Sequence, residues 1–190
     1  MRDLDVRCSL HELLREQHSA EAESTRIVDE FEIAGSARVD TIVLNGSFSG
    51  FEIKSERDTL RRLPHQVEVY SQVLDFATLV VAKSHLKKAR PLLPYWWGII
   101  EATSGPEGVQ LRQVKKARLN RVVDPIVLST LLWRAEVLEE LDARDAAGGV
   151  RSKPNWFLWE RLASTIPPRE LRAVVREKLK ARSGWRVPSQ

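Results

Sequence analysis

The chain has 190 residues, of which 43% are hydrophobic and 29% are charged, a composition typical of an ordered globular protein. This length is sufficient for one well-packed domain and a smaller appendage. No run of about 18 apolar residues occurs, and the first residues are charged, so we expect neither a membrane span nor a secretory signal. These features favour a cytoplasmic protein.

Cysteine and histidine usage excludes further classes of site. Cys8 is the single cysteine, so no intrachain disulfide can form, as suits a reducing compartment. The four histidines are scattered and lack the spacing of zinc ligands. We therefore expect neither a structural zinc nor a haem.

Positive charge is concentrated towards the end of the chain. The net charge is +4, and residues 151–190 hold ten lysines and arginines against three glutamates. This tail therefore carries +7, which leaves −3 on the first 150 residues. A basic tail on a near-neutral body is consistent with a polyanionic partner, although basic surfaces have many other uses.

The first part of the chain predicts a helix followed by three strands. Residues 5–17 carry apolar side chains at helical spacing. Residues 27–33 and 38–44 are typical of strands, because β-branched residues are frequent in the second of them. Asn45-Gly46 is a strong hairpin signal, and residues 47–54 form the third predicted strand.

The middle of the chain predicts alternating helices and strands. A capping box at Ser55 starts a short helix that ends near Leu63, and Pro64 begins the next helix, which runs to about residue 75. A buried strand, parallel to its neighbour, is expected next because a helix precedes it. This strand covers residues 76–82, and it is followed by a basic helix at 83–90 and a strand pair at 96–102 and 109–114.

The remainder of the chain predicts helices alone. Asp124 as N-cap and Pro125 in the first turn begin a helix that Gly148-Gly149 terminates. Two more helices follow, at about 156–164 and 168–182. We therefore predict an α/β core of residues 1–120 and a basic helical extension of residues 121–190.

Three charged residues interrupt two of the predicted strands. Glu52 and Lys54 are two apart, so they project from one face of their strand. Asp40 lies in the preceding strand and approaches Glu52 if the two strands pair through the Asn45-Gly46 turn. Charged residues are poor strand formers. Where they occur inside an otherwise regular apolar strand, a functional role is expected.

Two carboxylates and a lysine suit metal-dependent hydrolysis of a phosphodiester. Magnesium prefers oxygen ligands and keeps several waters, so Asp40, Glu52 and the backbone carbonyl of Ile53 are sufficient to hold it. On these residues alone, a cross-strand ion pair in a half-exposed hairpin is the better explanation. The order of the strands, and a following helix with Gln66 and Tyr70 on one face, reverse that preference.

This order of elements resembles the PD-(D/E)XK nuclease superfamily. The chain is also similar, over roughly residues 1–180, to a small bacterial and phage family within it. The resemblance implies a restriction-endonuclease-like fold, a mixed central sheet flanked by helices, with an all-helical C-terminal extension. One departure is Val39, which stands where the superfamily's name places proline, a degenerate position. The stretches that carry the similarity are GSARVD (35–40), GFEIKS (50–55), RDTLRRL (57–63), WGII (97–100) and LLWR (131–134).

The resemblance also implies roles for individual residues. Asp40 and Glu52 would bind Mg²⁺ or Mn²⁺, and Lys54 would orient or activate the attacking water. Gln66 and Tyr70 match the pair that, in the RecB-like branch, supports the site or contacts the DNA.

Many members of the superfamily add an acid from an element before the Asp-bearing strand. Glu30 is the first choice here, with Glu12 and Glu16 as alternatives. Each of them is equally consistent with a solvated charge. Asp58 is explained as well by helix capping as by contact with the site.

The last predicted helix carries a basic stripe opposite an apolar face. For this stripe, DNA-backbone contact and ordinary solvation are equally good explanations. Trp156 and Trp159 are better explained by packing than by stacking on bases. The stripe consists of Arg169, Arg172, Arg176 and Lys180.

We therefore expect a Mg²⁺- or Mn²⁺-dependent deoxyribonuclease that acts in repair, restriction or defence, with DNA as its partner. The sequence leaves open whether the chain forms a homodimer or a larger complex. The alternative is a catalytically silent subunit that keeps the nuclease fold and binds DNA or protein. A weaker third hypothesis is an RNA-directed nuclease.

Overall fold

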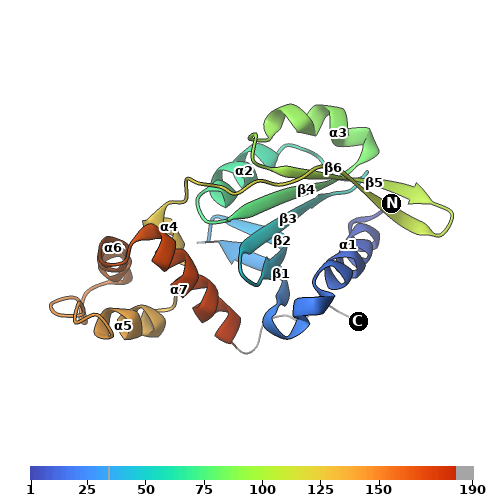
Figure 1. Cartoon of the computed structure of the whole chain (residues 1–190). Coiled ribbons are helices and arrows are strands. Elements are labelled where there is room, and N and C mark those ends of the chain that lie inside the picture. Colours follow the sequence, from blue (N-terminus) through green and yellow to red (C-terminus); the bar gives the residue numbers. More distant parts are fainter. Residues whose placement is uncertain (34, 183–190) are drawn as a thin grey trace.

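The centre of the molecule is a six-stranded mixed sheet with the strands in sequence order, as the computed structural model shows (Figure 1). Residues 1–33 and 35–182 are described, so the last eight residues of the predicted extension lie outside the description. The strands are β1 (Arg26–Ile33), β2 (Ala37–Leu44), β3 (Phe48–Lys54), β4 (Phe76–Ala82), β5 (Gly98–Gly105) and β6 (Gly108–Lys115). The helices are α1 (Asp3–Gln17), α2 (Leu63–Ser71), α3 (Lys83–Ala89), α4 (Pro125–Ser129), α5 (Arg134–Asp142), α6 (Asn155–Thr165) and α7 (Pro168–Ala181), with short 3₁₀ turns η1 (Ser19–Ser24) and η2 (Arg90–Leu92).

The sheet combines hairpins with parallel crossovers. Strands β1, β2 and β3 pair antiparallel, β3, β4 and β5 pair parallel, and β6 returns antiparallel to β5. The two parallel pairs each need a crossover, which α2 and α3 supply. The predicted α/β class, with a mixed central sheet flanked by helices and followed by C-terminal helices, is confirmed.

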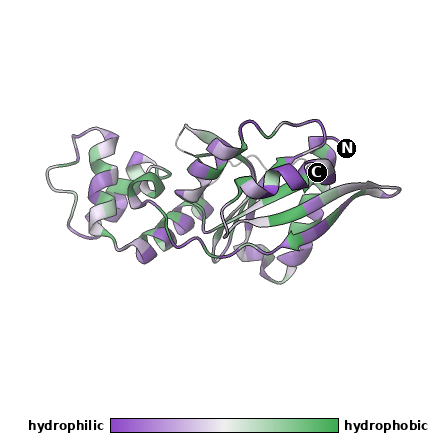
Figure 2. Ribbon diagram, turned by 90° about the horizontal axis from the view of Figure 1, so that it is seen from above, coloured by the Kyte–Doolittle hydropathy of each residue, from purple (hydrophilic) through white to green (hydrophobic). Residues whose placement is uncertain are grey.

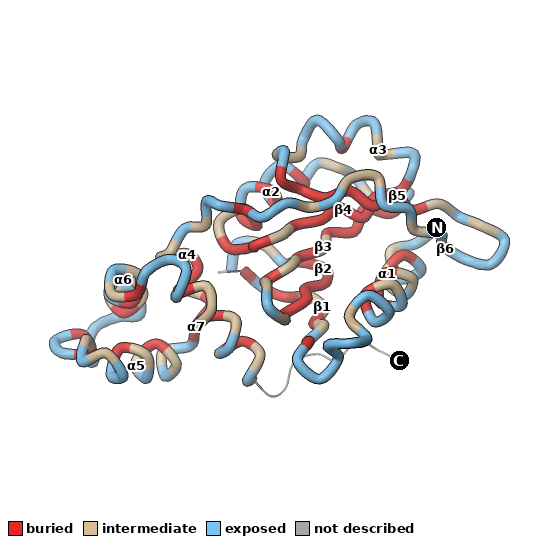
Figure 3. The backbone as a smooth tube through the Cα atoms, viewed as in Figure 1, coloured by how far each residue is buried: buried red, intermediate tan, exposed pale blue. Residues whose placement is uncertain are grey.

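The two faces of the sheet bury different partners. On one face, Val6, Leu10 and Leu14 of α1 pack against a small apolar cluster that includes Ile53 and Val80. The other face holds the larger core, to which α2 and the C-terminal helices contribute. Since successive strand residues point to opposite faces, Ile53 lies beneath α1 while its neighbours in the sequence point towards α2. Figure 3 shows how the buried residues follow the strands.

The C-terminal helices gather at one end of the sheet (Figures 1 and 2). Their buried residues, among them Leu128, Leu162 and Leu171, belong to the same apolar cluster as the sheet residues. A buried carboxylate, Asp75, ties α7 to the sheet: it accepts from Arg172 at 2.5 Å and from the backbone N–H of Phe48 at 2.9 Å. The division at residue 120 stays a prediction.

Two helix predictions are wrong. Residues 55–62 form turns instead of a helix, because Asp58 accepts from both the backbone N–H and the hydroxyl of Ser55 and so closes a turn. The single helix expected from 125 to 148 is two helices, α4 and α5. Between them Trp133 is extended, and its N–H donates to Glu136 at 2.7 Å, which caps a new helix.

Other boundaries differ by a few residues. Helix α2 ends at Ser71, earlier than the predicted residue 75, and β5 starts at Gly98 instead of 96. Asp124 caps α4 as expected, since its carboxylate accepts from the N–H groups of Ile126 and Val127. Among the described residues, no helix combines the length and the apolar character that crossing a membrane requires.

Candidate functional site

The candidate site lies where β1 and β2 depart from regular alternation. Val28 and Phe31 of β1 both point into the larger core, as do Val39 and Ile42 of β2. In each strand these two residues are three apart, whereas a regular strand places residues two apart on the same face. Ladder pairing likewise passes from Asp29↔Thr41 to Phe31↔Val39 and omits the residues between them. The omitted residues, Glu30 and Asp40, are thus opposite one another at a local distortion of the sheet.

Glu52 is the most enclosed acid of the site, with 2% of its surface exposed. One carboxylate oxygen, Oε1, accepts from Gln66 Nε2 at 2.6 Å and from Lys54 Nζ. The other, Oε2, lies 2.6 Å from the Tyr70 hydroxyl. The structure therefore joins four of the predicted site residues in one hydrogen-bonded group.

Tyr70 forms the support behind this group. Its ring stacks on the fully buried Trp97, with ring centroids 6.0 Å apart and planes inclined by 5°. Its hydroxyl also lies 2.7 Å from the carbonyl of Arg38. Burial, reinforced by the Glu52 carboxylate, raises the pKa of Tyr70, so the hydroxyl remains protonated and available as a donor.

Asp40 extends the β2–β3 ladder with its side chain. Its Oδ2 accepts from the backbone N–H of Ile53 at 2.7 Å. Burial, together with repulsion from Glu52, raises the pKa of Asp40 to about 7, against the opposing effects of Ile53 N–H and Lys54. Asp40 therefore changes its ionisation near neutral pH in the metal-free protein.

Glu30 has an unusual backbone for a strand residue. Its φ is +56°, in the left-handed region that residues other than glycine rarely adopt. Its carboxylate is held by two arginines, at 2.8 Å from Arg7 Nη2 and 2.6 Å from Arg38 Nε. A strained backbone held in place by its surroundings is typical of functional sites.

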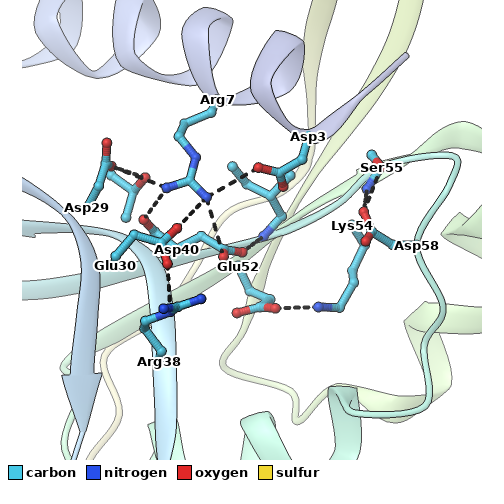
Figure 4. Close-up of polar contacts among 12 residues, drawn as sticks. Asp3, Arg7, Asp29, Glu30, Arg38, Asp40, Glu52, Lys54, Ser55 and Asp58 are labelled. Carbon is cyan, nitrogen blue, oxygen red and sulfur yellow. Dashed lines mark hydrogen bonds and ion pairs between the residues drawn. The ribbon is translucent and has the colours of Figure 1, made fainter. Parts of the chain in front are cut away.

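Arg7 of α1 is a site residue that the sequence did not reveal (Figure 4). Its guanidinium donates to the Asp40 carbonyl at 3.1 Å and lies 3.6 Å from Asp40 Oδ1. Asp3 at 3.2 Å, Asp29 at 4.0 Å and Glu30 complete a ring of four carboxylates around it. Although burial acts to lower it, the charges of Asp3 and Asp40 raise the pKa of Arg7.

One member of this ring, Asp29, has two further contacts. It accepts from Thr41 Oγ1 at 2.7 Å and lies 2.9 Å from His11 Nε2. Although burial acts to raise it, the hydrogen bonds from His11 and Thr41 lower the pKa of Asp29. The alternative acids Glu12 and Glu16 are exposed on α1 and do not line the cavity of the site.

A cavity of about 640 Å³ opens onto these residues. That volume is within the usual range for small-molecule sites. Gln66 presents an unusual group there, because its buried Oε1 finds no hydrogen-bond partner among the described residues. The cavity lining includes Glu30, Asp40, Glu52, Ile53, Lys54, Asp58, Arg62 and Gln66.

The chemistry of the donor atoms fits a divalent metal. Asp40 and Glu52 are hard oxygen donors whose mutual repulsion a cation would remove. Within residues 1–33 and 35–182, no three His, Cys, Asp or Glu side chains are arranged to share an ion. An ion at Asp40 and Glu52 would thus draw its other ligands from the backbone and water, as magnesium commonly does.

The structure gives two residues of the basic stripe another partner. Arg172 and Arg176 both contact Asp75, at 2.5 and 3.2 Å. Lys180 lies 3.4 Å from Glu177, and Arg169 is exposed. None of the four lines the cavity, and their contact with DNA stays a prediction.

The raised pKa of Asp40 predicts that the metal-free protein loses stability as the pH rises. Unfolded Asp40 ionises near 3.8 and folded Asp40 near 7, so its contribution is complete below pH 3.8 and lost by about pH 8. In a chelating buffer, Asp40→Asn should therefore gain up to about 4 kcal/mol over wild type between pH 4 and 8. Urea unfolding across this range measures the gain, and a constant difference would contradict the raised pKa.

Comparison with known proteins relates the chain to a phage family. A family model described as Bacteriophage P4 protein cII matches residues 1–186. Protein cII of Enterobacteria phage P4 is 26% identical over 143 residues, which is 75% of this chain and 53% of that protein. The chain thus spans about half the length of that relative. The SPO1766 protein of unknown function from Silicibacter pomeroyi, 21% identical, superposes with a TM-score of 0.42 over 70% of this chain and 88% of that one.

Proposed function

This chain belongs to the bacteriophage P4 protein cII family, and we propose that it is a metal-dependent nuclease that hydrolyses DNA phosphodiester bonds through a site of the PD-(D/E)XK type. The repair, restriction or defence context and the cytoplasmic location are part of the same proposal.

The arrangement around Glu52 is the observation that carries the proposal. A carboxylate with 2% exposure is held by Lys54, Gln66 and Tyr70 at the wall of a cavity. Burial, and then repulsion from this carboxylate, raises the pKa of Asp40 to about 7. If Glu52 and Lys54 formed only a structural ion pair, a second acid beside Glu52 would destabilise the protein without any benefit. Perturbed carboxylates that share a cleft are typical of functional sites.

Each residue has a task in such a reaction. Mg²⁺ or Mn²⁺ held by Asp40 and Glu52 would polarise the phosphoryl group and acidify a water. Lys54, on the same strand face as Glu52, is placed to orient that water and to offset negative charge on the phosphoryl oxygens. Tyr70 and Gln66 keep Glu52 in one orientation, and Asp40 is held by the Ile53 N–H.

A cleavage assay tests the proposal. Purified protein is incubated with single-stranded, duplex and nicked DNA, and with RNA, in the presence of Mg²⁺ or Mn²⁺. Wild type should cut DNA, Asp40→Ala should not, and the surface variant Asp142→Ala should cut like wild type, since Asp142 is exposed and does not line the cavity. The proposal fails if no DNA is cut or if Asp40→Ala is as active as wild type.

Arg7 favours a second candidate, a catalytically silent subunit that binds DNA or protein. Its guanidinium already compensates the ring of carboxylates that a metal would otherwise neutralise. Calorimetric titration with Mn²⁺ separates the two candidates. A nuclease should bind Mn²⁺ in wild type and lose that binding in Asp40→Ala, whereas a silent subunit should show no such binding in either protein.

A further inference from the structure

A large share of the positive charge that the fold leaves without an ion pair lies in residues 76–123, from β4 to the start of α4. Residues 76–123 hold nine lysines and arginines against two glutamates, a net charge of +7. One of the two acids, Glu101, is 7% exposed and is already paired with Arg112 at 3.0 Å. The net charge of this segment equals that of residues 151–190, which is also +7.

In the C-terminal helices, by contrast, most of the basic side chains have an acidic partner. Arg172 and Arg176 both form ion pairs with Asp75. Lys178 contacts Glu139 at 2.8 Å and Glu140 at 3.0 Å. Further pairs join Arg151 to Asp142, Lys180 to Glu177 and Arg182 to Glu136. Ion pairs thus neutralise six of the nine described lysines and arginines of the basic tail.

Five residues of the 76–123 segment form what we call the basic surface. Lys83, Lys87 and Arg90 line one surface hollow of about 540 Å³ along α3 and η2. Lys115 is the last residue of β6, and Arg118 follows three residues later. Burial, followed by the charges of Arg118 and Arg90, lowers the pKa of Lys115. Within the part of the chain that the structure describes, no acid forms an ion pair with any of the five.

The backbone holds the two halves of the basic surface together. The N–H of Arg118 donates to the carbonyl of Trp96 at 2.7 Å, which fixes the segment after β6 beside the short stretch that joins η2 to β5. In Figure 1, α3 and the yellow segment after β6 lie on the same side of the sheet. All five residues except the half-buried Lys115 are exposed.

The basic surface also has a defined relation to the candidate site. Lys54 pairs with Val81 across the parallel β3–β4 ladder, and Lys83 follows two residues later at the start of α3. The surface therefore begins at the edge of the sheet at which Lys54 lies, and it extends away from the cavity along α3.

We propose that the basic surface binds the phosphate backbone of DNA, a role that rests on the proposed function for the identity of the polyanion. Clustered like charges repel one another, and a chain of phosphates removes that repulsion while it releases condensed counterions. Exposed lysines and arginines on a helix and an adjoining segment contact phosphates without reading bases. The basic surface thus holds the substrate, and the acidic cavity cuts it.

Salt-dependent binding in the absence of metal tests this assignment. Anisotropy of a labelled DNA duplex is measured in a chelating buffer at several salt concentrations, with wild type, K87Q/R90Q and the matched tail variant R169Q/K180Q. The loss of two phosphate contacts should reduce the slope of log K against log salt by about 2 in K87Q/R90Q. The tail variant removes the same charge and should keep the wild-type slope.

Three results would overturn the assignment: no DNA binding by wild type, an unchanged slope in K87Q/R90Q, or the loss of slope in the tail variant instead. Binding of wild type to RNA or to anionic vesicles, without binding to DNA, is an instance of the first result. Since no metal is present, a failure of the nuclease proposal would appear only in the cleavage assay and would leave these slopes as they are.

Discussion

Glu52→Gln should abolish metal-dependent DNA cleavage and leave the fold intact. The substitution keeps the shape of the side chain, and its oxygen can still accept from Lys54 and Gln66. Its new N–H₂ can donate to the Tyr70 oxygen, whose own proton can go to the carbonyl of Arg38. What is lost is the negative charge that would hold the metal.

The expected loss of rate is large. Metal catalysis contributes several kcal/mol of transition-state stabilisation, so the cleavage rate should fall on the order of 10³-fold. Tyr70→Phe is the matched comparison, because it removes only a group that orients Glu52. It should cost on the order of 10- to 100-fold, as is typical of residues behind a metal ligand.

Single-turnover cleavage with saturating Mn²⁺ measures both losses, and thermal melting checks that both variants fold. Equal rates for Glu52→Gln and Tyr70→Phe would mean that the charge of Glu52 has no part in holding a metal. Full activity in Glu52→Gln would remove this residue from the site.

The second large effect concerns stability. Asp75→Ala should lower the free energy of unfolding by about 3 kcal/mol, the lower end of the range for breaking a buried ion pair. Asp75 has 4% exposure, and it is the shared partner of Arg172, Arg176 and the Phe48 N–H. Its removal leaves two guanidinium groups without a counter-ion and the Phe48 N–H without its acceptor, and only Arg172 keeps another hydrogen-bond partner, the Asn120 carbonyl.

Asp142→Ala is the control for this measurement. Its partner Arg151 is also an arginine of the C-terminal part, but both side chains are largely exposed. An exposed pair of this kind contributes at most about 1 kcal/mol. Urea unfolding of both variants distinguishes the cases, and equal small losses would show that Asp75 does not anchor α7.

Local patterns were enough to predict most of the elements and part of the site. The Asn45-Gly46 turn and the flanking strands place Asp40 and Glu52 on paired strands, as observed. The two-residue spacing put Glu52 and Lys54 on one face, and the four-residue spacing put Gln66 and Tyr70 beside Glu52. Such inferences succeed because the periods of strands and helices are local properties of the backbone.

The same reasoning failed at two places where a contact between residues three apart in the sequence closes a turn or starts a new helix. Trp133 interrupts a predicted helix because Glu136 caps a new one, and residues 55–62 turn because Asp58 binds Ser55. The predicted capping contact at Ser55 does form, but without the helix. A cap shows where a helix can begin, whereas packing decides whether the helix follows.

The sequence by itself thus determined the mixed α/β architecture and the Asp40, Glu52, Lys54 core of the candidate site, since both depend on periodic spacing within elements. Only the tertiary structure brought Arg7 from a helix some thirty residues away into the carboxylate ring, and placed the positive φ of Glu30 opposite Asp40. It also decided where free positive charge remains. A charge acts through its distance to other charges and not through its place in the chain, so most of the described basic tail is paired with acids that it meets on folding, and α3 is not.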